Sequence, residues 1–120
     1  MKKVLMIEDN EMLSDMYKFK LIHEWFNVFV ENDSLNAIKS FEEFQPEIIT
    51  LDIMMPWLNW YEVLEKIRKD LNSDVIVIML SNVNSEQDRE KAINLWANKF
   101  LLKASVTPQI LVSEINIMLE

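Results

Sequence analysis

The chain has 120 residues, of which 50% are hydrophobic and 27% are charged, as expected for one globular domain. Its formal net charge of −8 argues against general binding to nucleic acid or to anionic membranes. The absence of cysteine excludes disulfides and cysteine nucleophiles, and the absence of glycine excludes the GxGxxG and GxxxxGK phosphate-binding loops. We expect a single cytoplasmic domain over residues 1–120, with no membrane span and no output domain.

Five short apolar runs predict five strands. They are Val4–Ile7, Val28–Val30, Ile48–Leu51, Val75–Leu80 and Phe100–Leu102. Each run is continuous rather than alternating, which is typical of strands in a parallel sheet that is covered on both faces.

Apolar residues at helical spacing predict five helices between and after these runs. The residues are, in chain order, Met12, Met16, Phe19 and Phe26; Leu35, Ile38 and Phe41; Val63, Leu64, Ile67 and Leu71; Ala92, Ile93 and Trp96; and Leu111, Ile115 and Met118. Ser85 is a plausible N-cap of the fourth helix, and Thr107 followed by Pro108 is a clear start of the fifth. Strand and helix therefore alternate five times, which predicts an α/β fold with a doubly wound, five-stranded parallel sheet.

Polar side chains follow four of the apolar runs. Glu8 and Asp9 follow the first run, Asp52 the third, Ser81 the fourth and Lys103 the fifth. In open α/β sheets, ligands bind beyond the carboxyl ends of the strands, near the point where the strand order reverses. If the strand order is 2-1-3-4-5, these five side chains meet in one crevice.

The grouping of three carboxylates with one lysine indicates phosphate chemistry. Close carboxylates repel one another unless a cation offsets them. Lys103 supplies one positive charge, and a hard divalent ion such as Mg²⁺ would supply the rest. A carboxylate nucleophile, a divalent ion and a lysine together suit phosphoryl transfer. Glu31, Asn32 and Asp33 follow the second run at an edge strand, and we interpret them as a solvated turn and cap outside the pocket.

Each of these residues has a simpler interpretation when it is taken alone. Glu8 and Asp9 suit a solvated turn, and Asp52 suits the N-cap of a following turn. Ser81 suits a turn or a cap, and Lys103 suits the protein surface. Their joint placement at four strand ends, in a fixed order, favours the functional interpretation.

With these residues in place, the sequence resembles the receiver domain of two-component response regulators, a flavodoxin-like, chemotaxis-receiver-like fold, along its whole length. The resemblance rests on VLMIEDN at the start, LDIMMPWLNWYEVLEKIR in the middle, IVIMLSN after it and KFLLKAS near the end. It implies that Asp52 is the phosphoacceptor for a sensor histidine kinase or a phosphotransfer protein. It also implies that the domain is no enzyme beyond its own phosphorylation and dephosphorylation.

The resemblance further implies a Mg²⁺ site and a switch. Glu8 and Asp9 match the acidic pair that holds Mg²⁺, together with Asp52 and the backbone carbonyl of Met54. Met54 and Val83 match the two variable positions beside the path of hydrolytic water. Both side chains are apolar and cannot orient a water molecule, so we expect slow hydrolysis of the phosphorylated state.

Three more positions match the groups that respond to phosphorylation. Lys103 matches the lysine that pairs with phosphoryl oxygens, and Ser81 matches the switch hydroxyl that moves to bind them. Phe100 matches the aromatic residue whose rotation reports this movement. The resemblance implies a downstream protein partner at the fourth and fifth helices, bacterial phosphorelay signalling, and no direct contact with nucleic acid. It leaves homodimerisation open.

Two other functions compete with this interpretation. The first is a receiver-like interaction module that does not switch by phosphorylation. The second is a phosphatase with an aspartyl nucleophile, a class that generally has a second aspartate two residues after the first. Met54 occupies that position here, which disfavours the phosphatase.

The residue after the lysine departs from the family pattern. The family usually has a proline there, with a cis bond, whereas Ala104 follows Lys103 in this chain. A cis bond before a residue other than proline costs about 2.5–4 kcal/mol. Either the Lys103–Ala104 bond is trans in a modified loop, or the site holds that strain.

The four tryptophans stand where the family commonly has glycine. They are Trp25, Trp57, Trp60 and Trp96. Trp25 and Trp96 fall at expected helix ends, where the left-handed conformation is common and costs an L-residue about 1–2 kcal/mol. We favour a coding explanation, in which UGA codons that mean glycine in the source organism are translated as tryptophan; drift is the alternative. Trp57 and Trp60, with Leu58 between them, are expected to expose an apolar patch near the pocket.

Overall fold

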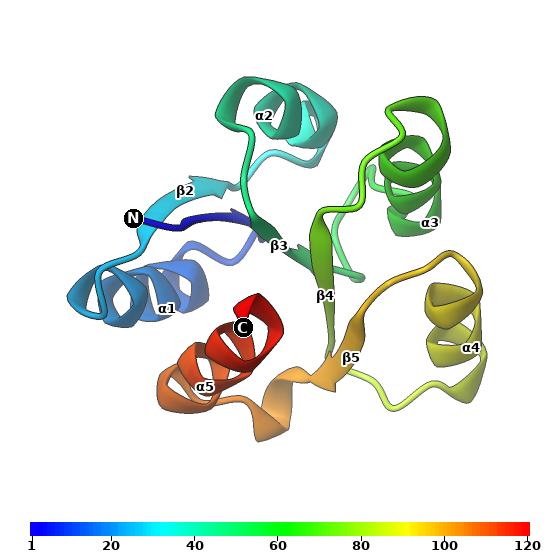
Figure 1. The fold of residues 1–120 in the computed structure, drawn as a ribbon. Coiled ribbons are helices and arrows are strands. Elements are labelled where there is room, and N and C mark those ends of the chain that lie inside the picture. The colour runs from blue at the N-terminus through cyan, green and yellow to red at the C-terminus, as the bar shows by residue number, and fades with distance from the viewer.

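Five parallel strands form the central sheet of the domain (Figure 1), and the computed structural model describes all residues from 1 to 120. The strands are β1 (Lys3–Ile7), β2 (Asn27–Glu31), β3 (Ile48–Asp52), β4 (Ile76–Ser81) and β5 (Lys99–Leu102). Their order is β2-β1-β3-β4-β5, and every neighbouring pair is parallel. The structure confirms the predicted fold and the strand order 2-1-3-4-5.

Five α-helices connect and follow the strands. They are α1 (Glu11–His23), α2 (Ala37–Phe44), α3 (Trp60–Glu65), α4 (Glu86–Asn94) and α5 (Pro108–Leu119). Short 3₁₀ turns occur at Ser34–Asn36 and Lys103–Ser105, and a π-helical turn, Lys66–Asp70, continues α3. None of the helices has the length and apolar character needed to cross a membrane.

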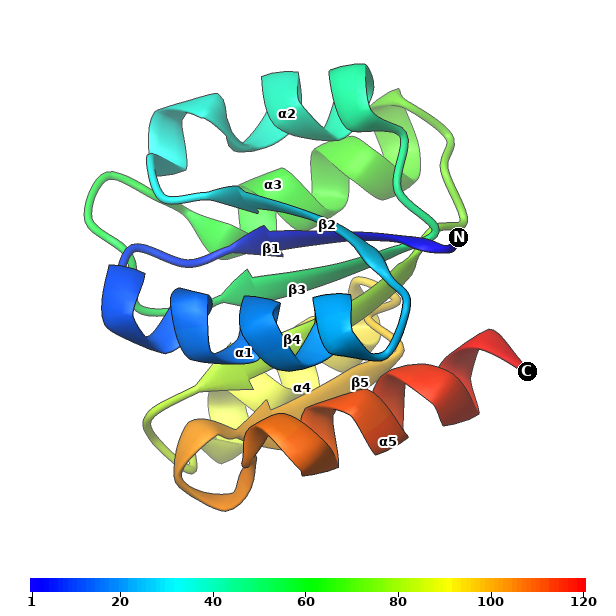
Figure 2. The ribbon, with the colours of Figure 1, turned by 90° about the vertical axis from the view of Figure 1, so that its left-hand side faces the viewer.

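The helices cover both faces of the sheet, and each face has its own hydrophobic core. Helices α1 and α5 lie side by side on one face (Figure 2), and α2, α3 and α4 cover the other. Leu5 and Ile7 of β1 pack toward α2, α3 and α4, whereas Val4 and Met6 pack toward α1 and α5. Because successive strand residues point to opposite faces and both faces are covered, the central strands β1, β3 and β4 are largely apolar, with Thr50 as a buried exception.

The predicted helix starts are confirmed by hydrogen bonds. The side chain of Ser85 accepts a hydrogen bond from the backbone N–H of Asp88 at 3.1 Å, at the start of α4. Thr107 accepts one from Ile110 at 3.2 Å, with Pro108 at the first position of α5. Each cap binds a backbone donor that has no partner within the helix, which fixes where the helix begins.

Helix α1 has apolar side chains on two opposite faces. Tyr17 and Leu21 are buried against the sheet, whereas Met12, Met16 and Phe19 are exposed. The spacing of the three exposed residues located the helix correctly, but these residues do not form its buried face. Phe26, the fourth residue of the predicted pattern, lies beyond the end of α1. The core accepts Tyr17 in their place because its hydroxyl donates a hydrogen bond to the backbone carbonyl of Val106 at 2.6 Å.

Three of the four tryptophans adopt the left-handed conformation. The φ angles are 71° at Trp25, 63° at Trp57 and 64° at Trp96, and all three side chains are exposed. Trp60 differs, because it is the first residue of α3 and only 6% exposed. The expectation for Trp25 and Trp96 is confirmed, and a side chain with a Cβ is strained at all three left-handed positions.

Trp25 ends α1 with a Schellman motif. Its N–H donates to the carbonyl of Ile22 at 3.0 Å, and the N–H of Phe26 donates to the carbonyl of Leu21 at 3.0 Å. This arrangement requires a left-handed residue between the helix and Phe26. The backbone hydrogen bonds therefore hold Trp25 in a conformation that glycine adopts with less strain.

Glycine should be more stabilising than alanine at position 25. Substitution by glycine and substitution by alanine both remove the indole, so the difference in stability between the two variants measures the effect of the Cβ atom. We expect the free energy of unfolding of Trp25→Gly to be about 1 kcal/mol higher than that of Trp25→Ala. At position 60, where the backbone is helical, the order should reverse, with Trp60→Ala more stable than Trp60→Gly. Urea unfolding of the four variants measures both differences. Equal stability of the two position-25 variants would contradict the strain.

Candidate functional site

Four strands place the predicted site residues at one edge of the sheet. Asp52 and Ser81 are the last residues of β3 and β4, and Glu8 and Lys103 directly follow β1 and β5. The strands run toward the same edge (Figure 2), and the order β2-β1-β3-β4-β5 makes these four strands neighbours. The structure thus gathers the predicted residues because parallel strands end together.

Lys103 forms two ion pairs with the buried carboxylates. Its Nζ lies 2.7 Å from Oε1 of Glu8 and 3.0 Å from Oδ2 of Asp52. All three side chains are almost fully buried. One ammonium group is therefore shared by two carboxylates, and the cluster retains net negative charge.

Backbone donors hold the second oxygen of each carboxylate. The N–H of Met54 donates to Oδ1 of Asp52 at 3.0 Å, and the N–H of Asn10 donates to Oε2 of Glu8 at 3.1 Å. The side chain of Asn10 also caps α1 by accepting from the N–H of Leu13. These bonds orient the two carboxylates toward the same space.

Burial and the neighbouring charges shift the pKa of Glu8 and of Lys103. Burial raises the pKa of Glu8 to about 7, because Lys103 offsets only part of the cost and Asp52 adds repulsion. For Lys103, burial acts to lower the pKa, but hydrogen bonds and charges from Glu8 and Asp52 outweigh it and raise the pKa above its ordinary value. An additional cation beside Glu8 would therefore favour its ionised form.

Asp9 completes a group of carboxylates that suits a divalent ion. One oxygen each of Glu8, Asp9 and Asp52 lies within 4.8 Å of the others. Oε1 of Glu8 is buried and, apart from the ion pair with Lys103, has no hydrogen-bond partner. Hard cations prefer such oxygen ligands, and the exposed Asp9 opens the group to solvent. Glu8, Asp9 and Asp52 are therefore arranged suitably to bind a divalent metal ion.

Asp52 is covered in this arrangement. The residue is 1% exposed, and Nζ of Lys103 lies beside its Oδ2 atom. Met54 and Val83, the predicted neighbours of the hydrolytic water, are both more than half exposed. Access to Oδ2 of Asp52 from solvent therefore requires Lys103 to shift.

The hydroxyl of Ser81 forms its hydrogen bonds within its own loop. Its Oγ accepts a hydrogen bond from the N–H of Val83 at 3.0 Å and donates one to the carbonyl of Val83 at 2.8 Å. It makes no hydrogen bond to Asp52 or Lys103. The hydroxyl is thus near the site but is held by its own loop.

The region around Lys103 resolves the question raised by Ala104. No cis peptide bond is present, so the Lys103–Ala104 bond is trans, and Lys103–Ser105 forms a 3₁₀ turn. Phe100, three residues earlier, is buried in β5. The lysine reaches both carboxylates from this modified loop.

The sequence interpretation missed one residue beside the site. Asn32 donates from its side-chain amide to the backbone carbonyl of Glu8 at 2.6 Å and to Oγ of Ser14 at 3.3 Å. It is half-buried rather than part of a solvated turn, so the interpretation of Asn32 was wrong. Asp33, by contrast, does cap the following turn by accepting from Leu35. A polar residue after β2 was the only signal for Asn32 in the sequence.

The predicted apolar patch beside the site is smaller than expected. Trp57 is 87% exposed, but Leu58 is half-buried against the core and Trp60 is buried. The prediction was therefore wrong for Leu58 and Trp60. Trp57 instead lines a shallow cavity of about 260 Å³ that includes Asp9 and Asn32.

The family model of the response regulator receiver domain matches residues 4–116. The chain belongs to this family. It is 33% identical over 102 residues to the probable transcriptional regulator ycf27 of Guillardia theta, a match that covers 85% of this chain and 39% of that protein. The chain thus spans well under half of the length of this curated relative.

Solved structures share the fold of this receiver. The receiver domain of the Francisella response regulator 1452 is 25% identical, with a TM-score of 0.88 and coverage of 98% of this chain and 95% of that one. A CheY-like receiver domain protein of Methanospirillum hungatei JF-1 is 24% identical, with a TM-score of 0.91 and coverage of 99% and 94%. The second likeness shows the fold alone.

Removal of the Glu8 charge should flatten the dependence of stability on pH. The pKa of Glu8 is about 7 in the folded protein and 4.5 ordinarily, so between these values the folded state holds a proton that the unfolded state has lost. Stability should therefore fall as the pH rises from about 4.5 to about 7, and Glu8→Gln should remove this decline. Urea unfolding in metal-free buffer measures it. Glu11→Gln, at an exposed carboxylate, should keep the decline in stability. If the decline persists in Glu8→Gln, Glu8 is not its cause.

Proposed function

We propose that this receiver accepts a phosphoryl group on Asp52 from a histidine-kinase phosphohistidine or from a phosphotransfer protein. The reaction depends on Mg²⁺ held by Glu8, Asp9, Asp52 and the backbone carbonyl of Met54. The observation that carries the proposal is the burial of two carboxylates around one lysine, next to a third carboxylate that is open to solvent. A cluster this acidic is suited to a divalent cation and to a phosphoryl group rather than to stability alone.

Each side chain has a defined part in the transfer. An oxygen of Asp52 attacks phosphorus, a new O–P bond forms, and the N–P bond of the donor histidine breaks, with its electrons returning to the imidazole. Mg²⁺, when bound, would neutralise phosphoryl oxygens during this transfer. Lys103 leaves Oδ2 of Asp52 and pairs with a phosphoryl oxygen, so its positive charge stays within the site.

The same group of residues supports a switch. A phosphoryl group brings about −1.5 to −2 charge and strong acceptor oxygens. The hydroxyl of Ser81 can donate to one of them only by releasing the carbonyl of Val83, which moves the loop before α4. Phe100 on β5 responds to that movement, and the altered surface of α4 and α5 is read by a downstream protein partner.

Acetyl phosphate with Mg²⁺ should raise the mass of the protein by one phosphoryl group. Asp52→Asn should abolish the rise, because it removes the nucleophile, and chelation of the metal should suppress it. Asp70→Asn, at an exposed carboxylate at the end of the π-helical turn after α3, is the matched control and should be labelled normally. Because Met54 and Val83 cannot orient water, the label should be lost slowly. No labelling, or labelling that survives Asp52→Asn, would favour a module that does not switch.

The exposed face of α1 provides a docking surface for the protein that donates the phosphoryl group. Helix α1 begins two residues after Asp9, and the stripe of Met12, Met16 and Phe19 runs away from the site along its solvent side. Exposed apolar side chains in a row are typical of a surface that binds a partner. A donor protein that rests on this stripe can present its phosphohistidine at the edge of the sheet.

Charge on the stripe should slow transfer from a donor protein but not from a small molecule. Phe19→Glu should slow phosphotransfer from a phosphorylated histidine kinase about tenfold, as loss of an interface anchor does. Labelling by acetyl phosphate should be unchanged, because Phe19 lies outside the site. Ile93→Glu places the same charge at an exposed apolar residue of α4 and should not slow the kinase reaction. Equal rates for wild type and Phe19→Glu would exclude docking on the stripe.

A further inference from the structure

The turn that carries Lys103 has few features of its own that would hold it in place. Lys103 begins the 3₁₀ turn Lys103–Ser105 between β5 and α5, and the side chains of Ala104 and Ser105 are exposed. Alanine after Lys103 leaves the backbone free, whereas a proline ring would fix one of its dihedral angles. Contacts from outside the turn must therefore help to determine the direction in which Lys103 points.

Tyr17 of α1 forms a hydrogen bond with the residue that closes this turn. Its hydroxyl donates to the backbone carbonyl of Val106 at 2.6 Å, and the N–H of Val106 donates to the carbonyl of Lys103 at 3.1 Å. No other side chain forms a hydrogen bond with the backbone of residues 103–106. Two successive hydrogen bonds therefore connect α1 to the residue whose ammonium group forms the ion pairs of the site.

The hydroxyl of Tyr17 is buried close to the charged groups of the site. Tyr17 is 1% exposed and packs with Val106 in the core that α1 and α5 cover. Burial raises the pKa of Tyr17, while the charges of Lys103 and Glu8 act on it in opposite directions, so the hydroxyl keeps its proton and remains a donor. A buried hydroxyl requires a hydrogen-bond partner, and the carbonyl of Val106 supplies it.

We propose that Tyr17 is a positioning residue for Lys103. Its hydrogen bond holds the turn so that the ammonium group points toward the carboxylates and, after phosphorylation, toward the phosphoryl group. The inference rests on the proposed function, because it concerns the pairing of Lys103 with phosphoryl oxygens. The hydroxyl of Tyr17 is bonded to Val106 rather than to a group of the site, so it acts through the backbone of the turn.

Loss of this hydrogen bond should affect the two ligands of the site differently. A turn that is held less firmly presents Lys103 less accurately to a phosphoryl oxygen, which should weaken binding of a phosphoryl group. Mg²⁺ and Lys103, by contrast, share the carboxylates of Glu8 and Asp52, and the two cations repel each other. A looser turn should therefore not weaken the binding of Mg²⁺ alone.

Beryllofluoride, a mimic of the phosphoryl group, tests this expectation in the presence of saturating Mg²⁺. Tyr17→Phe keeps the ring and removes only the hydroxyl, and it should weaken beryllofluoride binding about three- to tenfold, as expected for loss of one hydrogen bond. The affinity for Mg²⁺ alone should not fall. Calorimetric titration measures both affinities. Without ligand, the amide hydrogen of Val106 should exchange faster in Tyr17→Phe than in the wild type.

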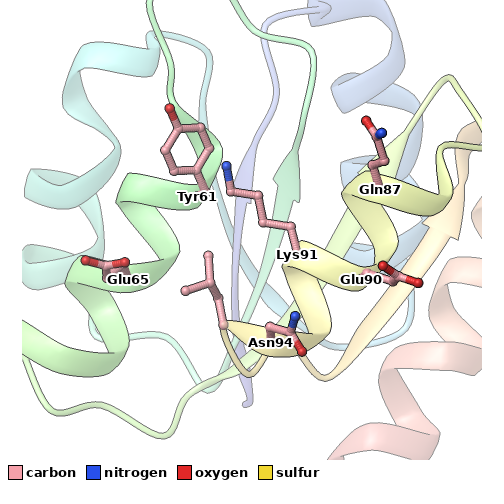
Figure 3. A pocket seen from close by; sticks show the side chains of 7 residues that line it. Tyr61, Glu65, Gln87, Glu90, Lys91 and Asn94 are labelled. Carbon is pink, nitrogen blue, oxygen red and sulfur yellow. The ribbon is translucent and has the colours of Figure 1, made fainter.

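Two control variants separate the effect on Lys103 from loss of a hydroxyl elsewhere and from loss of stability. Tyr61, the other tyrosine, lies on the opposite face of the sheet, where it faces Lys91 across the pocket between α3 and α4 (Figure 3). Tyr61→Phe should leave both affinities unchanged. Ile115→Val removes one methylene from the same core as Tyr17 and lowers stability without removing a hydrogen bond, so it should also leave both affinities unchanged.

The outcomes distinguish this inference from the proposed function. A wild-type protein that binds no beryllofluoride would contradict the proposed function. Exchange of the Val106 amide would then decide the role of Tyr17 by itself, and unchanged exchange in Tyr17→Phe would refute that role. If the wild type binds but Tyr17→Phe has the same affinity for beryllofluoride, or loses affinity for both ligands, the proposed function stands and the positioning of Lys103 by Tyr17 is refuted.

Discussion

The shared ion pairs of Lys103 are the constraint on which the rest of the site depends. One ammonium group lies between Glu8 and Asp52, far from bulk water, and it leaves the cluster with an excess of negative charge. A buried pair of this kind adds little to stability, but removal of the lysine would leave two buried carboxylates in repulsion. The domain therefore retains a site that is short of positive charge, and this deficit is what makes a divalent cation favourable.

The fold was predictable because it depends on patterns that lie along the chain. Continuous apolar runs located each strand, and polar residues at their ends predicted the site before any contact was known. Parallel strands bring Glu8, Asp52, Ser81 and Lys103 together whatever the details of packing. Contacts between elements were not predictable in this way. The amide of Asn32 on the carbonyl of Glu8 depends on the path of one loop, which no local pattern encodes.

The position of a helix is also predictable from local sequence, whereas the face that it buries is not. Period alone predicted α1, but Met12 and Phe19 face solvent while Tyr17 and Leu21 face the core. A helix with apolar residues on two sides gives no internal sign of which side packs on the sheet. Which face packs on the sheet depends on side-chain shape and on a hydrogen-bond partner for the Tyr17 hydroxyl. That partner, the carbonyl of Val106, is 89 residues away in the sequence.

The cation–π contacts of α4 are relevant to the proposed switch. A switch needs two arrangements that differ by only a few kcal/mol, and a helix anchored by deep apolar burial would resist movement much more strongly. Besides the buried Ala92 and the half-buried Leu95, Arg89 and Lys91 attach α4 through cation–π contacts with Phe100 and Tyr61. In the proposed switch, the sheet keeps Asp52 and Lys103 in register while α4 moves.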